Sequence, residues 1–412
     1  MDRSQIIAAL EAALDENSET HKVALEKACK QPRELAESLF NYDLSKPVRV
    51  VLETQPEFQT PELLYVFSDS GCGAFDPRRV SVALVAKARE TRSVALAVDW
   101  LEKVLATEQA VGFRITALWG ITVNSRVSLT QEVELVPVGE LPASKEKEML
   151  LDYQLEKSAQ PNLPFDPPKT ALVCRMTIDP FISRYPREAS ENPHRLRLKL
   201  LNEILLVLTL VGPCTPIRYI SWFQFEDVDL DVARLGRAVS YAIPEIMPKF
   251  LKEYGSFDPD MAKQIIRLYL DLERKVKKKV QVALERLHQS MRRASVGDQA
   301  LEVSIALESL LADGGTENTY KVGLRSALLL GGELAERLDI RTVVSGTYAL
   351  RSALVHEGEA GDTIRLKRRG KEKSKEVVNE AILICARVIR RILELGGIPD
   401  WYEFELSNCD SL

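Results

Sequence analysis

The hydrophobic pattern of the last third of the chain constrains the fold most strongly. From Pro259 onward, apolar residues recur every three to four positions, the spacing of an amphipathic α-helix. The pattern predicts helices at residues 261–294, 298–311, 317–338, 342–357 and 376–395. The last of them carries one wide apolar stripe, formed by Val377, Ala381, Ile384, Cys385, Val388, Ile392 and Leu395. Because such a stripe needs helical partners, we expect residues 259–412 to form an all-helical domain.

The beginning of the chain has a mixed pattern and predicts an α+β region over residues 1–195. Two or three short amphipathic helices are expected in the first 45 residues, and a longer helix at 80–105. Segments rich in β-forming residues lie at 48–52, 63–67, 113–123, 127–136 and 171–178. Proline-rich loops are expected at 161–168 and 180–193.

Residues 196–258 combine a helix at 196–210 with an aromatic strand at 216–225, which makes them a mixed connecting region. The predicted fold class is therefore an α+β amino-terminal region followed by an all-α helical bundle. A chain of 412 residues is long enough for two or three domains of this kind.

The charge and the cysteines exclude several classes of function. A net charge of −5 argues against general avidity for nucleic acid, so any RNA contact must come from a local basic patch. The six cysteines show no CxxC spacing, and we expect neither a zinc site, nor a disulfide framework, nor a cofactor. No apolar run is long enough to cross a bilayer and no secretory signal is evident, so we expect a cytoplasmic protein without membrane contact.

Two other patterns are better explained by structure than by ligand binding. Asp227, Asp229 and Asp231 alternate like calcium ligands, but the glycine and the final glutamate of a calcium loop are missing, so a solvated cluster before a helix is expected. His288 is remote from any metal-binding pattern and is interpreted as a surface or packing residue.

The most informative stretch is TYALRSALVHEG, residues 347–358, in which four residues separate Arg351 from His356. RNA can be cleaved without a metal because its 2′-hydroxyl lies next to the scissile phosphate. Histidine can give or take a proton near neutral pH, and arginine is a permanent, forked cation for phosphate oxygens. Gly358 is expected to cap the helix, which would place His356 in its last turn, where the helix dipole favours a cation.

This stretch resembles the RxxxxH signature of the HEPN superfamily, in its Apea-like branch. IALESLL (305–311) with the preceding Asp298, ENTYKVGLRSALLLGGELAERL (317–338) and the GIPDW ending (397–401) resemble the helices around that signature. The resemblance covers roughly residues 260–406. It implies a homodimer in which two Arg/His pairs line one cleft and cleave RNA without a metal.

The resemblance also suggests roles for neighbouring residues. Ser352 occupies a position where many members of the family carry Asn or Asp, and both it and Tyr348 would support the catalytic pair. An aromatic residue one turn before Arg351 is also common as simple core. A basic run follows the motif and would guide RNA phosphates, or else form a solvated loop or helix start: Arg365, Lys367, Arg368, Arg369 and Lys371.

The implied setting is bacterial anti-phage defence or growth arrest. Residues 1–195 are loosely similar to the sensor-like regions that precede such domains in phage-defence proteins, so a phage-derived trigger is one expected partner. Two alternatives stay open. The helical domain could be a catalytically silent module that dimerises or binds RNA or nucleotide, or the chain could be the toxin of a toxin–antitoxin pair.

Overall fold

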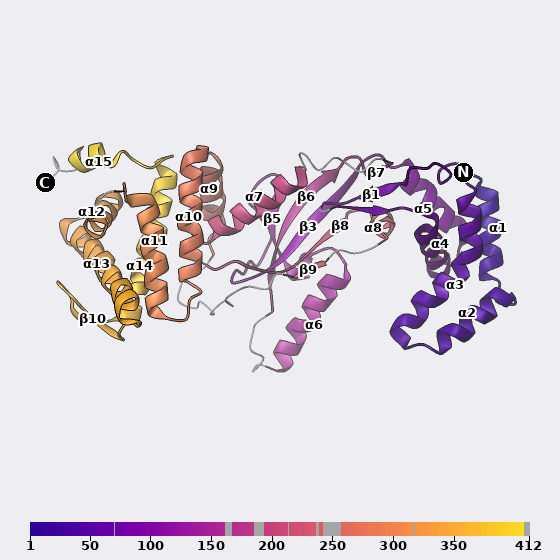
Figure 1. Ribbon diagram of the computed structural model, residues 1–412, viewed down its shortest axis with the longest axis horizontal. Helices are drawn as coiled ribbons and strands as arrows, with labels where there is room; N and C mark the ends of the chain where they lie inside the picture. Colours follow the sequence, from indigo (N-terminus) through magenta and orange to yellow (C-terminus); the bar gives the residue numbers. More distant parts are fainter. Residues whose placement is uncertain are drawn as a thin grey trace. The chain divides into compact units, whose positions relative to one another are not determined.

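The structure is a computed structural model, drawn in Figure 1. It describes residues 1–69, 71–160, 167–184, 193–212, 214–235, 239–241, 257–314 and 317–407. The chain divides into two compact units, each made of segments that are not contiguous in sequence. Unit 1 comprises Met1–Ile115, Val173–Leu196 and Ser221–Ser240, and unit 2 comprises Thr116–Leu172, Arg197–Ile220 and Tyr241–Leu412.

Unit 1 begins with helices that confirm those expected in the first 45 residues. The helices of this stretch and the next are α1 (Arg3–Leu14), α2 (Glu19–Cys29), α3 (Arg33–Glu53), α4 (Pro77–Thr91) and α5 (Val94–Ala106). Asp2, Ser18, Asp76 and Ser93 each accept a hydrogen bond from a backbone N–H in the first turn of a helix. These bonds satisfy donors that the helices would otherwise leave unpaired.

The strand expected at residues 48–52 is wrong, because these residues belong to α3. Val48 and Leu52 are fully buried one turn apart, whereas Val50 between them is exposed. Burial at a spacing of four residues is helical, so packing overrides the β propensity of the valines here.

The single helix expected at residues 80–105 is interrupted and forms α4 and α5 instead. Arg92 adopts the left-handed conformation with φ +53°, which ends α4, and the Ser93 hydroxyl then caps α5. Hydrophobic spacing reveals neither the left-handed conformation of Arg92 nor the cap formed by Ser93, so this break was not predicted.

Strands confirm the mixed character of the first 241 residues. A three-stranded antiparallel sheet has the order β2-β1-β7, and a six-stranded sheet has the order β4-β5-β6-β3-β8-β9. The bounds are β1 (Tyr65–Phe67), β2 (Cys72–Ala74), β3 (Ala110–Trp119), β4 (Val127–Ser128), β5 (Val133–Pro137), β6 (Thr170–Ile178), β7 (Ile182–Ser183), β8 (Ile217–Phe225) and β9 (Val239–Tyr241).

Among the described residues, three further helices belong to this part of the chain. Helix α6 (Lys145–Ala159) was not expected from the sequence, whereas α7 (Pro193–Leu208) confirms the helix expected at 196–210. A short 3₁₀ turn, η1 (Val138–Glu140), precedes α6, and α8 (Val228–Ala233) follows β8. Most of the loops expected at 161–168 and 180–193 lie outside the described residues.

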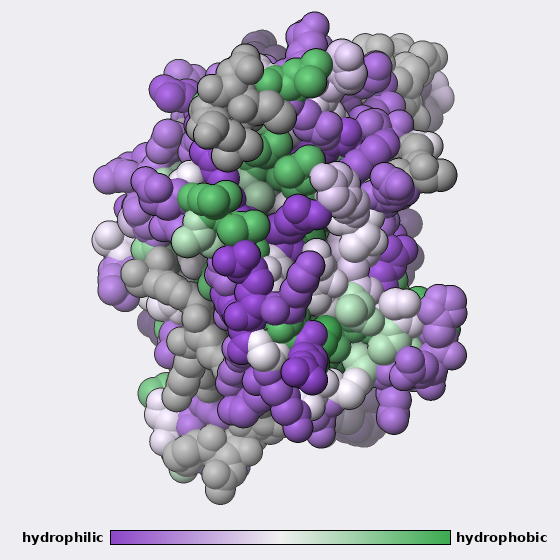
Figure 2. Space-filling model, turned by 90° about the vertical axis from the view of Figure 1, so that its left-hand side faces the viewer, coloured by the Kyte–Doolittle hydropathy of each residue, from purple (hydrophilic) through white to green (hydrophobic). Residues whose placement is uncertain are grey.

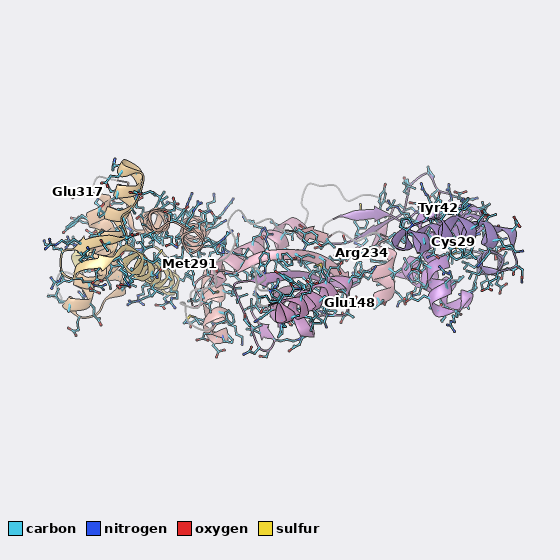
Figure 3. The ribbon with its side chains drawn as sticks, turned by 90° about the horizontal axis from the view of Figure 1, so that it is seen from below. Cys29, Tyr42, Glu148, Arg234, Met291 and Glu317 are labelled. Carbon is cyan, nitrogen blue, oxygen red and sulfur yellow. The ribbon has the colours of Figure 1, made fainter. Side chains whose placement is uncertain are left out.

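The alternating aspartates are capping and ion-pairing residues. Asp227 caps α8 by accepting the Asp229 N–H at 2.9 Å, and Asp229 in turn accepts a hydrogen bond from Lys103 at 3.0 Å. Asp231 forms an ion pair with Arg234, a residue labelled in Figure 3, with 3.2 Å between Arg234 Nε and Asp231 Oδ1. All three carboxylates therefore have protein partners and are partly buried, whereas a solvated cluster before a helix was expected.

The carboxy-terminal part is helical from Pro259, as the sequence predicts. The helices are α9 (Pro259–Leu270), α10 (Arg274–Ser290), α11 (Val296–Leu311), α12 (Asn318–Leu330), α13 (Leu334–Glu357), α14 (Ser374–Glu394) and α15 (Trp401–Ser407). Met291, which ends α10, and Glu317, which precedes α12 at φ +65°, are labelled in Figure 3.

Two helix boundaries in this part were predicted wrongly. The helix expected at 261–294 is divided into α9 and α10 by a turn in which Leu272 is buried. The break expected between residues 338 and 342 lies instead at Gly331 and Gly332, with φ values of +68° and +92°. Glycine adopts such values without a steric penalty, and the following residues then continue as one helix, α13.

The domain is also not all-α, because the basic run forms a β-hairpin. Strands β10 (Thr363–Leu366) and β11 (Gly370–Lys373) pair antiparallel between α13 and α14. Gly370 adopts φ +81° directly after the three-residue turn, as many short hairpins require.

The core of these helices is formed by α11, α13 and α14. Of the apolar stripe predicted on α14, only Leu395, which ends the helix, is exposed. Two glycines allow close packing: a Cβ at Gly346 would lie 2.5 Å from Leu366 Cδ2, and one at Gly297 would lie 3.0 Å from Leu354 Cδ1. The hairpin and the start of α11 thus pack directly against α13.

Candidate functional site

Helix α13 places the Arg/His motif in its last two turns. The helix runs unbroken for 24 residues and ends at Gly358, which adopts φ +86° and donates its N–H to the Leu354 carbonyl at 3.0 Å. The predicted cap is therefore confirmed, and His356 lies in the last turn as expected.

Arg351 is oriented by a carboxylate on the neighbouring helix α11. Its Nη1 atom donates to Glu308 Oε1 at 2.7 Å, and its guanidinium lies 5.7 Å from the centre of the Tyr348 ring. The Arg351 side chain is still 31% exposed and Glu308 is 23% exposed. The guanidinium is thus held at one edge while other N–H groups remain near the surface.

Tyr348 is a core residue, one of the two roles considered from the sequence, and it also contacts Arg351. Its side chain is buried in the core, and its ring lies beneath the Arg351 guanidinium. Burial, followed by the nearby Glu308 carboxylate, raises the pKa of Tyr348 far above its usual range. The phenol therefore stays neutral, and its contribution is to position Arg351.

His356 and Ser352 lie on the exposed side of α13. In the part of the chain that the structure describes, the His356 ring forms no hydrogen bond or ion pair. Ser345, Ala349, Ser352 and His356 are all exposed and follow one another at intervals of three or four residues, which defines one stripe along the helix. We call these four residues the α13 stripe.

Arg351 and His356 do not meet within one chain. Five residues of an ideal helix correspond to a rotation of about 140° and a rise of about 7.5 Å. Arg351 accordingly faces α11, whereas His356 faces solvent beside Val355, which is 61% exposed.

The hairpin presents a basic face to solvent. Arg365 lies directly opposite Lys371, and Thr363 lies opposite Lys373. These residues are exposed, whereas Leu366, on the alternate face, is buried against Gly346 of α13. Two cations directly opposite each other repel, so this arrangement favours binding of an anion.

The remaining basic residues of the run divide into two groups. Lys367 and Arg368 are exposed in the turn of the hairpin. Arg369 is instead held by two carboxylates: its Nε donates to Asp339 of α13 at 2.6 Å, and its Nη1 donates to Glu380 of α14 at 2.9 Å. Asp339 raises the pKa of Arg369 further above its usual range. Arg369 anchors the hairpin and is the least available of the five for phosphate.

Sequence reasoning overlooked Glu308 and the hairpin geometry. Glu308 is the one acid in IALESLL, and an acid inside an apolar helix segment is a signal that it has a cationic partner. The hairpin could have been inferred from Gly370 among residues with β propensity.

Figure 2 shows one face of the molecule in space-filling form. Hydrophobic side chains form a few separate patches in a mainly hydrophilic surface. No single large apolar area dominates the coloured part of this face.

Searches for other features and for relatives give negative results. No group of three or more His, Cys, Asp or Glu side chains among the described residues is arranged to hold a metal ion. Within the same residues, no helix has the length and hydropathy required to span a membrane. Comparison with family models, curated proteins and solved structures finds no match to this chain.

Proposed function

We propose that the carboxy-terminal helices form a HEPN-type endoribonuclease that acts as a homodimer and needs no metal. One observation carries the proposal: Arg351, oriented by Glu308, and the exposed His356 occupy the last two turns of one helix. The basic hairpin supports it, because it packs along the same helix, with Leu366 against Gly346 and Arg369 paired with Asp339.

The chemistry requires only proton transfer and stabilisation of charge. The RNA 2′-oxygen attacks phosphorus, a 2′-O–P bond forms and the P–O5′ bond breaks, which leaves a 2′,3′-cyclic phosphate and a 5′-hydroxyl. An imidazole accepts the 2′-hydroxyl proton and then donates it to the departing 5′-oxygen. Guanidinium groups stabilise the charge on the non-bridging oxygens.

The proposed dimer accounts for the separation of the two side chains within one chain. Small residues in the α13 stripe, Ser345, Ala349 and Ser352, would allow the same helix of a second copy to approach closely. His356 ends this stripe, so two copies related by a twofold axis would bring two imidazoles and two guanidiniums to one cleft.

The hairpin would hold the RNA strand by its phosphates. Arg365, Lys367, Arg368 and Lys371 are exposed and form the proposed phosphate-binding surface, while Arg369 fixes the hairpin to α13 and α14. A local surface of this kind can attract RNA although the whole chain carries a net charge of −5.

A catalytically silent RNA-binding module is the second candidate. It is favoured by the ion pair of Arg351 with Glu308, which occupies one edge of the guanidinium. Both candidates share the same RNA surface and dimer, so they differ only in whether RNA is cut. Anti-phage defence or growth arrest is the proposed setting, and co-purification of a small companion protein would favour the toxin–antitoxin alternative.

The deciding experiment is cleavage of labelled RNA in EDTA by the purified chain and its variants. We expect the parent to produce 2′,3′-cyclic phosphate ends, and His356→Ala and Arg351→Ala to lower the rate about 100-fold or more. His356 is exposed, so removing its side chain should not affect folding. Arg351→Lys retains the positive charge next to Glu308 and is the variant to use if Arg351→Ala does not fold. Arg274→Ala, an exposed arginine on α10, is the matched control. Equal rates for all proteins would reject the enzyme, and RNA binding without cleavage would establish the silent module.

A further inference from the structure

A second candidate site lies in unit 2, in a pocket of about 580 Å³. Its walls come from α9, α12, α14 and α15, and its volume is within the range of small-molecule sites. Along α14, Arg387 lies seven residues beyond Glu380, which pairs with Arg369 of the hairpin, or about 10 Å at 1.5 Å per residue.

Two arginines in this pocket lack carboxylate partners. Arg387 and Arg390 are one turn apart on α14, and neither forms an ion pair within the described ranges. The contact found for Arg390 is from Nη1 to the sulfur of Met261 at 3.4 Å, and sulfur is a weak acceptor. Arg391, on the same helix, differs because it is paired with Glu394 at 3.0 Å.

Arg390 is only partly exposed, so its charge is poorly solvated. Burial, and next the charge of Arg387, lower the pKa of Arg390, while Glu394 in the same pocket opposes this shift, and a guanidinium remains a cation at physiological pH. The last turn of α12 also lines the pocket, but the carbonyl end of a helix supplies only about half of a negative charge. The pocket therefore retains uncompensated positive charge, which a bound anion would neutralise.

The rest of the wall combines apolar residues with the polar side chains of Gln264, Arg391 and Glu394. Ile265 and Leu268 of α9, Leu328 of α12 and Phe404 of α15 line the same pocket as the two arginines. A free inorganic anion would leave these walls without a partner. A ligand that also carries an apolar or aromatic body would use both the charge and the walls.

We propose that this pocket binds a small molecule that joins a phosphate group to an apolar or aromatic body, with Arg387 and Arg390 holding the phosphate. The arrangement of a forked cation pair beside aliphatic walls and one aromatic ring matches a nucleoside monophosphate or an alkyl phosphate. The inference does not rest on ribonuclease activity, since it concerns other residues and is tested by binding alone.

The test is titration calorimetry of the full chain with AMP, hexyl phosphate and inorganic phosphate. We expect at least one of the two organic phosphates to bind at least tenfold more tightly than inorganic phosphate. Arg390→Met, which keeps the length of the aliphatic stem, and Arg387→Gln, at an exposed position, should each weaken that binding at least tenfold. Arg274→Gln, at an exposed position of α10, should leave it unchanged.

The outcomes separate the possible ligands. Preference for AMP would identify an aromatic body and preference for hexyl phosphate an alkyl one, and either supports the proposal. Organic phosphates that bind no better than inorganic phosphate would overturn it, as would binding that both arginine variants leave unchanged. If Arg390→Met fails to fold by circular dichroism, Arg387→Gln alone decides.

Discussion

At the scale of single residues, the position of Arg351 depends on Glu308 as much as on its own helix. The carboxylate on α11 and the Tyr348 ring fix the guanidinium from two sides, and neither contact is visible in the RxxxxH spacing. In the proposed enzyme, Glu308 is a positioning residue that acts through Arg351 and does not itself touch the RNA.

Replacing Glu308 with Gln should lower single-turnover RNA cleavage about tenfold, because Arg351 loses its charged partner and its fixed orientation. RNA affinity should stay the same or increase, since a negative charge next to the RNA is removed. Rates and binding measured in parallel would check this separation. A Glu308→Gln enzyme with the parent's rate would show that the ion pair has no role in catalysis.

His288 provides a pH-dependent contribution to stability. It is partly buried, its Nε2–H donates to the Pro216 carbonyl at 3.2 Å, and loss of solvation lowers the pKa of His288 to about 4. In the unfolded chain a histidine titrates near 6.5. The unfolded state therefore binds the proton more tightly, so stability is complete above about pH 6.5 and is lost as the pH falls towards 4.

The free energy of unfolding should fall by about 2 kcal/mol between pH 7.5 and pH 5 because of His288 alone. Urea denaturation of the parent and of His288→Gln at both pH values would measure it. The glutamine can still donate to the Pro216 carbonyl but does not titrate, so its stability should depend less on pH. The same slope in both proteins would exclude this role of His288.

At the scale of elements, the hairpin combines a structural cost with a proposed function. Arg365 and Lys371 oppose each other across the ladder, and Arg369 and Leu366 hold the hairpin to the helices. A pair of like charges is unfavourable for the fold alone, which is the kind of local conflict expected at a binding surface.

Replacing Arg365 with Thr should therefore separate stability from RNA binding. We expect the free energy of unfolding to rise by about 0.2–1 kcal/mol, because the repulsion across the ladder is removed. The slope of log binding constant against log salt for single-stranded RNA should decrease by about 0.7, because one phosphate contact is lost. Lys278→Thr, on the exposed side of α10, is the control. A variant with weaker folding and unchanged RNA binding would contradict both expectations.

The contact between the hairpin and α13 can be tested at Gly346. The Cβ of alanine at this position would lie 2.5 Å from Leu366 Cδ2, so the hairpin would have to move away from α13. We expect Gly346→Ala to cost about 1–3 kcal/mol of stability and to weaken RNA binding as well. Gly361→Ala, where the nearest atom is 3.7 Å away, should have little effect on either. Equal stability of the two variants would show that this packing is not tight.

At the scale of the whole molecule, the proposed site is complete only in a pair of chains. A mixture of Arg351→Ala and His356→Ala chains tests this directly, since a mixed dimer would contain one intact arginine and one intact histidine from different copies. Cleavage should reappear on mixing to a measurable fraction of the parent rate, while each variant alone stays inactive. Parent activity combined with no recovery in confirmed mixed dimers would require both groups from one chain.

The sequence alone determined the elements that depend on local periodicity. The apolar stripe of α14, the helix cap at Gly358 and the strands at β3, β6 and β8 were each correctly predicted, because burial on one face leaves a repeat that can be read directly. The predicted helix boundaries were wrong where the backbone conformation of a single residue sets them, as at Arg92 and Gly331, because hydrophobic spacing gives no information on φ.

Tertiary structure decided everything that joins distant parts of the chain. Glu308, the partner of Arg351, is 43 residues away on α11. Arg369 forms hydrogen bonds with carboxylates of two helices. The arginine-lined pocket is formed by residues of four helices. Such contacts depend on how the helices pack. The sequence shows which residue stands at a position, but not which partner its side chain contacts. The residue types of the candidate site were therefore predictable, whereas their pairing and availability came only from the fold.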